Sequence, residues 1–234
     1  MLQPVAMALV LALALPAALA AQERPAADVA RDAARKPDAM VAFAGVKPGD
    51  TVADMIPGAG YFTRVFSRAV GPGGKVFAII PAQAEAAYPE PSKAIRAMAG
   101  GGWPNVAVVS SPLDPAVVGK LDLFWTAQNY HDLHNSQTPE QVIAFNKAVF
   151  AALKPGGTYV IVDHAGRDGS GRTETKTLHR IDPAVIRSEA EAAGFRFDGE
   201  SPALRNSADP RTANVFDPAI RGKTDQIAYR FRKP

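Results

Sequence analysis

Residues 52–63, with the sequence VADMIPGAGYFT, decide the fold because they join an apolar segment to a glycine turn and then to an amphipathic segment. Residues 51–56 are apolar and lie between two Pro-Gly pairs, which is typical of a buried strand. Residues 61–70 place their apolar side chains at helical spacing. We therefore expect a strand, a tight turn and a helix in succession.

The turn between this strand and this helix has the features of a small-molecule site. Gly58 and Gly60 let the backbone approach a ligand closely, and the helix that follows offers unpaired N–H groups and the positive end of its dipole. Asp54 adds a carboxylate at the end of the strand. We interpret this turn as a cofactor site. The alternative is an ordinary tight turn in which Asp54 caps the backbone amides that follow it.

The overall composition indicates one domain behind an export signal. The chain has 234 residues, which suits a single domain of roughly 200 residues after processing. Residues 1–20 carry no charge, are apolar over residues 5–15 and end in Ala-Leu-Ala, a small-residue cleavage pattern. We predict a signal peptide at residues 1–20, a linker and N-terminal helix at residues 21–36, the main domain at residues 37–234, and a periplasmic location.

The composition also excludes several classes of site. With no cysteine, the chain has no disulfide, thiolate metal ligand or cysteine nucleophile. Its net charge of +3 is spread over interspersed acidic and basic residues, which gives no argument for nucleic-acid binding. After the signal, no segment approaches the ~20 consecutive apolar residues of a membrane helix, so we expect no stable membrane insertion of the mature chain. The oligomeric state is left open.

Strands and helices alternate along the rest of the chain. Expected strands lie at residues 51–56, 75–80, 106–109, 121–126, 158–163, 195–200 and 226–232; expected helices lie at residues 61–70, 83–99, 139–153 and 183–193, after one or two helices over residues 28–44 that break near Lys36-Pro37. This order predicts an α/β fold with an open, doubly wound, mostly parallel sheet. No helix separates the last two strands, so the last strand is expected to be antiparallel. Ligands of such sheets bind at the carboxyl ends of the strands.

Two further segments carry a resemblance to a known family. Residues 42–50 (AFAGVKPGD) precede the glycine turn, and residues 153–157 (LKPGG) precede a strand. Together with the turn, they resemble class I S-adenosylmethionine-dependent methyltransferases, and more closely the exported predicted methyltransferases of unknown substrate. The resemblance covers residues 37–234. It implies a Rossmann-like sheet of seven strands with the last antiparallel, S-adenosylmethionine as cofactor, and a small molecule as methyl acceptor.

The resemblance also assigns cofactor contacts around the turn. Asp54 matches the acid that ends the first strand, and Gly58 and Gly60 match the second and third glycines of the family motif. Ile56 replaces the first glycine, and Ile80 stands where the family usually has an acid that accepts hydrogen bonds from the ribose. The predicted cofactor-binding residues are Asp54, Pro57, Gly58, Gly60, Tyr61, Thr63, Ile80 and Asn129.

The two isoleucines leave a second interpretation open. Losing the acceptor for the ribose hydroxyls costs on the order of 1–3 kcal/mol of binding unless another group replaces it, and Gln83 or Glu85 stand close by in the sequence. The alternative function is therefore a noncatalytic or repurposed small-molecule-binding protein on the same fold.

All four histidines fall at the expected carboxyl edge of the sheet. The resembled fold places pocket-lining residues after its fourth strand, where His131 lies. We predict His131 as a general base, because the unperturbed pKa of imidazole near 6.5 suits proton removal at neutral pH, and Tyr130 and Asp132 as its orienting partners. The residues predicted to contact the substrate are His134, His164, Arg172 and His179.

Two other roles for these imidazoles remain open. His131 and His134, together with His164 or Asp163, could form a three-ligand metal site of nitrogen and oxygen donors, which would suit a metal-dependent hydrolase. Alternatively, the histidines hydrogen-bond to backbone carbonyls and only stabilise loops. The sequence prediction assigns no metal.

Overall fold

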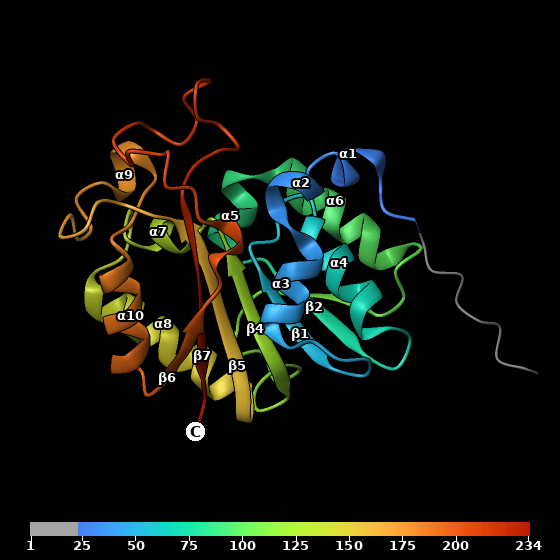
Figure 1. Cartoon of the computed structure of the whole chain (residues 1–234). Coiled ribbons are helices and arrows are strands. Elements are labelled where there is room, and N and C mark those ends of the chain that lie inside the picture. The colour runs from blue at the N-terminus through green and yellow to red at the C-terminus, as the bar shows by residue number, and fades with distance from the viewer. Residues whose placement is uncertain (1–22) are drawn as a thin grey trace, which may run out of the picture.

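A seven-stranded sheet runs through the middle of the protein in the order β3-β2-β1-β4-β5-β7-β6 (Figure 1). The structure, a computed structural model, describes residues 23–234; the predicted signal peptide lies outside them. The strands are β1 (Thr51–Met55), β2 (Lys75–Ile79), β3 (Val106–Val109), β4 (Leu121–Ala127), β5 (Leu153–His164), β6 (Arg196–Glu200) and β7 (Gln226–Arg232). β7 pairs antiparallel with β5 and β6, and the other pairs are parallel. The predicted sheet is confirmed.

Alternating side chains of the central strands pack into two separate cores, one on each face of the sheet. Val52 of β1 belongs to one core and the adjacent Ala53 to the other, as the two-residue period of a strand requires. Helices α3 (Pro37–Ala44), α4 (Tyr61–Val70) and α6 (Pro89–Gly100) contribute to the Val52 core. Helices α8 (Pro139–Ala152) and α10 (Pro183–Ala192) contribute to the Ala53 core (Figure 1). Burial on both faces explains why these strands are apolar throughout.

Local sequence signals set the ends of several helices. α8 begins with a capping box in which Thr138 and Gln141 satisfy each other's backbone amides, and Pro139 occupies the first helical position. Such a cap is worth about 1 kcal/mol. The predicted helix at residues 83–99 is instead two helices, α5 (Ala82–Ala87) and α6. They meet at Tyr88, which has a φ of −132° because the following Pro89 disfavours the helical conformation there.

Three short helices lie in segments that the sequence predicted as loops or linker. They are α7 (Tyr130–Leu133), α9 (Thr175–Leu178) and a 3₁₀ turn (Pro202–Leu204). Strand β5 also begins earlier than predicted, at Leu153, because β4 pairs with residues on both sides of the Pro-Gly-Gly turn. Single-turn helices have no periodic pattern that sequence reading can detect.

The N-terminal segment packs against the carboxyl edge of the sheet. It forms α1 (Ala26–Val29) and α2 (Asp32–Arg35), and the left-handed Lys36, with a φ of 47°, confirms the predicted break before α3. A buried ion pair of 2.6 Å between Asp28 Oδ2 and Arg64 Nε fixes α1 to α4. Tyr61 donates a 2.6 Å hydrogen bond to Asp32 and so fixes α2 to the same helix. None of the helices in residues 23–234 has the length and apolarity needed to cross a membrane.

Candidate functional site

A cavity of about 290 Å³ lies at the carboxyl ends of β1, β2 and β4. Its volume is close to the lower limit of about 300 Å³ for ligand pockets. Its lining residues come from the glycine turn, from α2, from the α5–α6 region and from the segment after β4. The cofactor-binding residues predicted from the sequence that line it are Pro57, Gly58, Tyr61, Ile80 and Asn129.

The two glycines of the turn serve different purposes. Gly58 has a φ of +57°, and a Cβ built on it meets no atom within 4 Å, so the space beside it is open to a ligand. A Cβ on Gly60 would lie 2.6 Å from Ile95 Cδ1, so this glycine lets α6 pack against the turn. Ile56, before the two glycines, also has a left-handed backbone, with a φ of 50°. That conformation costs a branched residue on the order of 1–3 kcal/mol, a strain typical of ligand sites.

Asp54 is part of the structure beneath the turn. Thr63 Oγ1 donates a 2.7 Å hydrogen bond to Asp54 Oδ2, and neither residue lines the cavity. Burial raises the pKa of Asp54 to about 7, while hydrogen bonding to Thr63 opposes the rise. Asp54 therefore bonds a side chain of the helix that follows the turn, and because Asp54, Gly60 and Thr63 are absent from the cavity lining, their direct contact with a cofactor stays a prediction.

The wall formed by Ile80 has no acid. Ile80 lines the cavity and is 3% exposed. Neither Gln83 nor Glu85 lines the cavity, and the carboxylate of Glu85 is bound at 2.8 Å by Arg96. Among the residues that line this cavity, Asp132 alone carries a carboxylate, and it follows β4, whereas Ile80 follows β2. The acceptor that Ile80 lacks is therefore not supplied by its sequence neighbours.

Two arginines of the N-terminal segment line the cavity, and sequence reading missed both. Arg35 Nη2 donates a 2.8 Å hydrogen bond to Gln128 Oε1, and Arg31 lies beside it. Burial, with a smaller contribution from Arg31, lowers the pKa of Arg35 to about 10, so the side chain stays cationic at neutral pH. Within residues 23–234 neither arginine forms an ion pair. This end of the cavity therefore favours an anionic ligand group.

Asn129 connects the two central strands at the cavity wall. Its Nδ2 donates to the carbonyl of Met55 at 3.0 Å, and its Oδ1 accepts from Thr126. These bonds hold the end of β4 against the end of β1. Asn129 therefore shapes the cavity, and its amide is already engaged by the protein.

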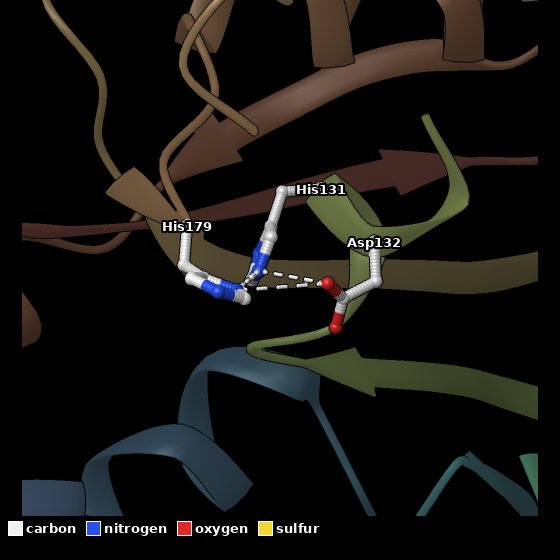
Figure 2. A group of neighbouring side chains, drawn as sticks. All are labelled: His131, Asp132 and His179. Atoms are coloured by element: carbon white, nitrogen blue, oxygen red, sulfur yellow. Dashed lines mark hydrogen bonds and ion pairs between the residues drawn. The ribbon is translucent and has the colours of Figure 1, made fainter. Parts of the chain in front are cut away.

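Beyond Asn129, three polar side chains converge beside the cavity. Figure 2 shows His131 and Asp132 of α7 facing His179, which follows α9. His131 Nε2 lies 3.2 Å from His179 Nδ1 and 3.3 Å from Asp132 Oδ1, and the last two atoms are 3.7 Å apart. We call these three residues the His-Asp-His cluster. The sequence predicted all three as site residues, and the structure brings them together.

Asp163 at the end of β5 holds His131 in place. Its Oδ1 pairs with His131 Nδ1 at 2.8 Å, and its Oδ2 accepts the His131 backbone N–H at 2.8 Å. Burial alone would lower the pKa of His131, but Asp163 and Asp132 outweigh it and raise this pKa to about 10. The free imidazole is then protonated at neutral pH and donates hydrogen bonds. His131 as a general base stays a prediction that this charge state disfavours.

Tyr130, His134 and Arg172 lie away from the cavity, around Glu189 of α10. Tyr130 donates to Glu189 Oε2 at 2.9 Å, and Arg172 Nε donates to Glu189 Oε1 at 3.2 Å. His134 Nε2 lies 3.2 Å from Glu189 Oε2, and its side chain is 2% exposed. The roles in catalysis and substrate contact that the sequence predicted for these three residues stay predictions, which their position around Glu189 does not favour. They instead connect α7 and the loop after β5 to α10.

His164 is held separately from the His-Asp-His cluster. Its Nδ1 pairs with Thr224 Oγ1 at 2.8 Å, and its ring centroid is 6.3 Å from that of His131. Burial lowers the pKa of His164 to about 4, with Asp163 opposing, so the ring is neutral. The predicted metal set of His131, His134 and His164 or Asp163 does not assemble, because His134 faces Glu189 and Asp163 is occupied by His131.

Comparison with known proteins establishes the fold. No protein-family model matches the chain, and no curated protein matches it. A methyltransferase from Aquifex aeolicus that depends on S-adenosylmethionine is 20% identical, with a TM-score of 0.63 over 91% of this chain and 100% of that one. The fold is that of the methyltransferases.

Two other solved structures show that proteins of this fold differ in activity. The cyclase SpnF is 16% identical, with a TM-score of 0.61 over 86% of this chain and 80% of that one. Fibrillarin from Aeropyrum pernix, solved with natively bound S-adenosyl-L-methionine, is 16% identical, with a TM-score of 0.52 over 86% of this chain and 76% of that one. A cyclase and a protein that binds S-adenosylmethionine share this scaffold, so the activity has to be argued from the site.

Proposed function

We propose that this protein is a methyltransferase that uses S-adenosylmethionine and modifies a small molecule. The observation that carries the proposal is Gly58, which has open space beside it and lines a cavity at the carboxyl ends of β1, β2 and β4. Open α/β sheets bind their ligands at this edge. The Aquifex protein of the same fold is described as dependent on S-adenosylmethionine, which supports the choice of cofactor.

The residues of the cavity fit such a cofactor. Pro57 and Gly58 would contact the nucleoside through the backbone, and Ile80 would supply an apolar wall for it. Arg31 and Arg35 would hold the carboxylate of the amino-acid part, because they are the cationic groups of the cavity. Bound there, the cofactor would supply an electrophilic methyl group on a sulfonium.

The chain itself would contribute positioning. Methyl transfer by direct displacement needs the acceptor held in line with the methyl group and water kept away, and correct orientation alone can supply several kcal/mol of the barrier reduction. Asp132, which follows β4, lines the cavity and connects it to His131 and His179. The acceptor would therefore be oriented by the His-Asp-His cluster. His131 is held for that task by Asp163.

Calorimetric titration of the full chain with S-adenosylmethionine and S-adenosylhomocysteine tests the proposal. We expect micromolar binding of both ligands to the wild-type protein. Gly58→Val should abolish it, because the branched side chain fills the open position. Gly119→Val is the matched control: Gly119 also has a positive φ, of +69°, with open space around it, and is absent from the cavity lining.

Two results would contradict the proposal. Absence of binding to the wild-type protein would favour the repurposed binding protein, for which the acid missing at Ile80 is the relevant observation. Equal loss of affinity in Gly58→Val and Gly119→Val would show that the ligand does not bind at the turn.

A further inference from the structure

The His-Asp-His cluster has the composition and spacing of a metal-binding site. We propose that His131, Asp132 and His179 bind one divalent transition-metal ion at the edge of the cavity. Each residue offers one ligand atom, and all three atoms lie within 4.8 Å of one another. The metal site stands on this geometry and does not depend on the proposed methyltransferase function.

The distances between the three atoms fit a metal ion at their centre. Ligand atoms of a tetrahedral ion with bonds of about 2.1 Å are separated by about 3.4 Å. The observed separations are 3.2, 3.3 and 3.7 Å. An ion can therefore be accommodated with shifts of a few tenths of an ångström in the side chains. Figure 2 shows that the three side chains approach from three different directions and converge.

The surroundings of His131 are those of a metal-ligating histidine. Such histidines donate the N–H of the nitrogen that does not bind metal to a carboxylate or carbonyl, which fixes the ring orientation. Asp163 Oδ1 takes this role at 2.8 Å from Nδ1 and is itself fully buried. The ring therefore presents Nε2 to His179 and Asp132, and a bound metal takes the place of the proton on Nε2.

His179 is held toward the cluster by a strained backbone. It has a φ of 54°, the left-handed conformation that residues with a side chain rarely adopt. Its ring packs edge-on against Phe216, with centroids 4.9 Å apart. The Val215 backbone N–H, next to Phe216, donates to the carbonyl of Leu178 at 3.2 Å. The loop before β7 therefore fixes the position of His179.

The donor set indicates which ions would bind. Two imidazoles and one carboxylate suit Zn²⁺ and its first-row neighbours, whereas Mg²⁺ and Ca²⁺ prefer oxygen ligands. Three protein ligands leave at least one coordination position for another molecule. Because Asp132 also lines the cavity, that position is accessible to an oxygen donor bound there. The corollary, which rests on the proposed function, is that the methyl acceptor carries a hydroxyl or carboxylate oxygen that binds the metal.

Titration of the metal-free full chain with Co²⁺ and Zn²⁺ tests the site. We expect one ion per chain, a visible absorption spectrum of tetrahedral or five-coordinate Co²⁺, and displacement of Co²⁺ by Zn²⁺. His179→Ala and Asp132→Asn should each weaken Zn²⁺ binding by more than about 100-fold. Asp163→Asn should weaken it by about 10- to 100-fold, because it removes only the orienting partner.

His134→Gln is the matched control because it removes a nearby histidine that faces Glu189. It should leave Zn²⁺ affinity unchanged. The proposal is overturned if the wild-type protein binds no stoichiometric Zn²⁺ or if folded His179→Ala and His179→Gln, checked by circular dichroism, retain wild-type affinity. Stoichiometric Zn²⁺ binding without binding of S-adenosylhomocysteine would support the metal site and contradict the methyltransferase function, so the two proposals fail separately.

Discussion

Asp54 in β1 and Asp163 in β5 are both buried carboxylates near the carboxyl ends of parallel strands, but the protein gives them opposite charge preferences. Asp54 is 2% exposed and Asp163 is 0% exposed. Burial raises the pKa of Asp54 to about 7, and among residues 23–234 its hydrogen-bond donor is Thr63, which does not offset the burial. Burial acts on Asp163 in the same direction, but the His131 side chain and the backbone donors outweigh it and lower the pKa of Asp163.

The difference shows that partners, more than depth of burial, set the charge of a buried acid. Asp163 accepts from the backbone N–H groups of His131 and His164 as well as from the His131 ring. Each such bond favours the charged form. The glycine turn is therefore organised by backbone conformation above an acid with a raised pKa, whereas the His-Asp-His cluster beside the cavity is organised by buried charges.

Removing Asp163 should give the largest effect on folding. Asp163→Ala leaves the buried His131 ring and two backbone N–H groups without their acceptor, and loss of one partner of a buried pair costs about 3–5 kcal/mol. Urea unfolding monitored by circular dichroism measures the change. Glu90→Ala, which removes an exposed ion pair to Lys93, should change stability little. A loss below about 1 kcal/mol for Asp163→Ala would contradict the assigned role of Asp163.

Asp54→Asn should stabilise the protein, and the gain in the free energy of unfolding should depend on pH. The native state holds the Asp54 proton up to a pKa of about 7, whereas the unfolded chain loses it near 3.8, so ionisation increasingly favours unfolding between these values. The rise of the Asp54 pKa from 3.8 to about 7 corresponds to at most about 4 kcal/mol in the free energy of unfolding. The stability advantage of Asp54→Asn over the wild type should therefore grow from pH 4 to pH 7 and then level off. Unfolding curves of both proteins across this range measure the difference, and a difference that does not change with pH would contradict the raised pKa of Asp54.

Substitutions at the two glycines of the turn test whether Gly60 has a packing role that Gly58 lacks. Gly60→Ala brings a Cβ to 2.6 Å from Ile95 and adds the strain of a positive φ, which together should cost about 2–4 kcal/mol. Gly58→Ala adds only the backbone strain, about 1 kcal/mol. Thermal unfolding of both variants measures this. Equal losses of stability in Gly60→Ala and Gly58→Ala would mean that the packing of α6 does not depend on Gly60.

Arg35→Ala should give the smallest effect and act on binding. Removing one of two neighbouring cations should weaken binding of S-adenosylhomocysteine about tenfold, or roughly 1.4 kcal/mol, because Arg31 remains. Calorimetric titration gives the affinity, and Arg68→Ala serves as a control outside the cavity. Unchanged affinity of Arg35→Ala for S-adenosylhomocysteine would contradict the proposed contact between the arginines and the ligand carboxylate.

The sheet was predictable because its signals are local and repeated. All seven strands were predicted from apolar segments, from Pro-Gly boundaries and from the helical spacing of the segments between them. The antiparallel strand was predicted because no helix precedes residues 226–232. The break at Tyr88 was missed although Pro89 and Pro91 are visible in the sequence, because the apolar spacing continues across it.

The site was harder to predict because its contacts depend on short elements. Residues four apart on a helix share a face, so α7 points Tyr130 and the following His134 together toward Glu189 and turns His131 toward Asp163. When the same segment is interpreted as a loop, the directions of its side chains cannot be predicted. Arg31 and Arg35 lie in a segment that the sequence predicted as helical, but contacts distant in the sequence place them at the cavity: the bonds of α1 and α2 to α4, and the bond of Arg35 to Gln128.

The central claim is that the cavity at the glycine turn holds S-adenosylmethionine. A crystal structure of the full chain with saturating S-adenosylhomocysteine tests it most directly. We predict ligand density between Gly58 and Asp132, with the nucleoside against Ile80 and the carboxylate at Arg35. A cavity without ligand at saturating concentration, or ligand bound elsewhere on the protein, would contradict the claim.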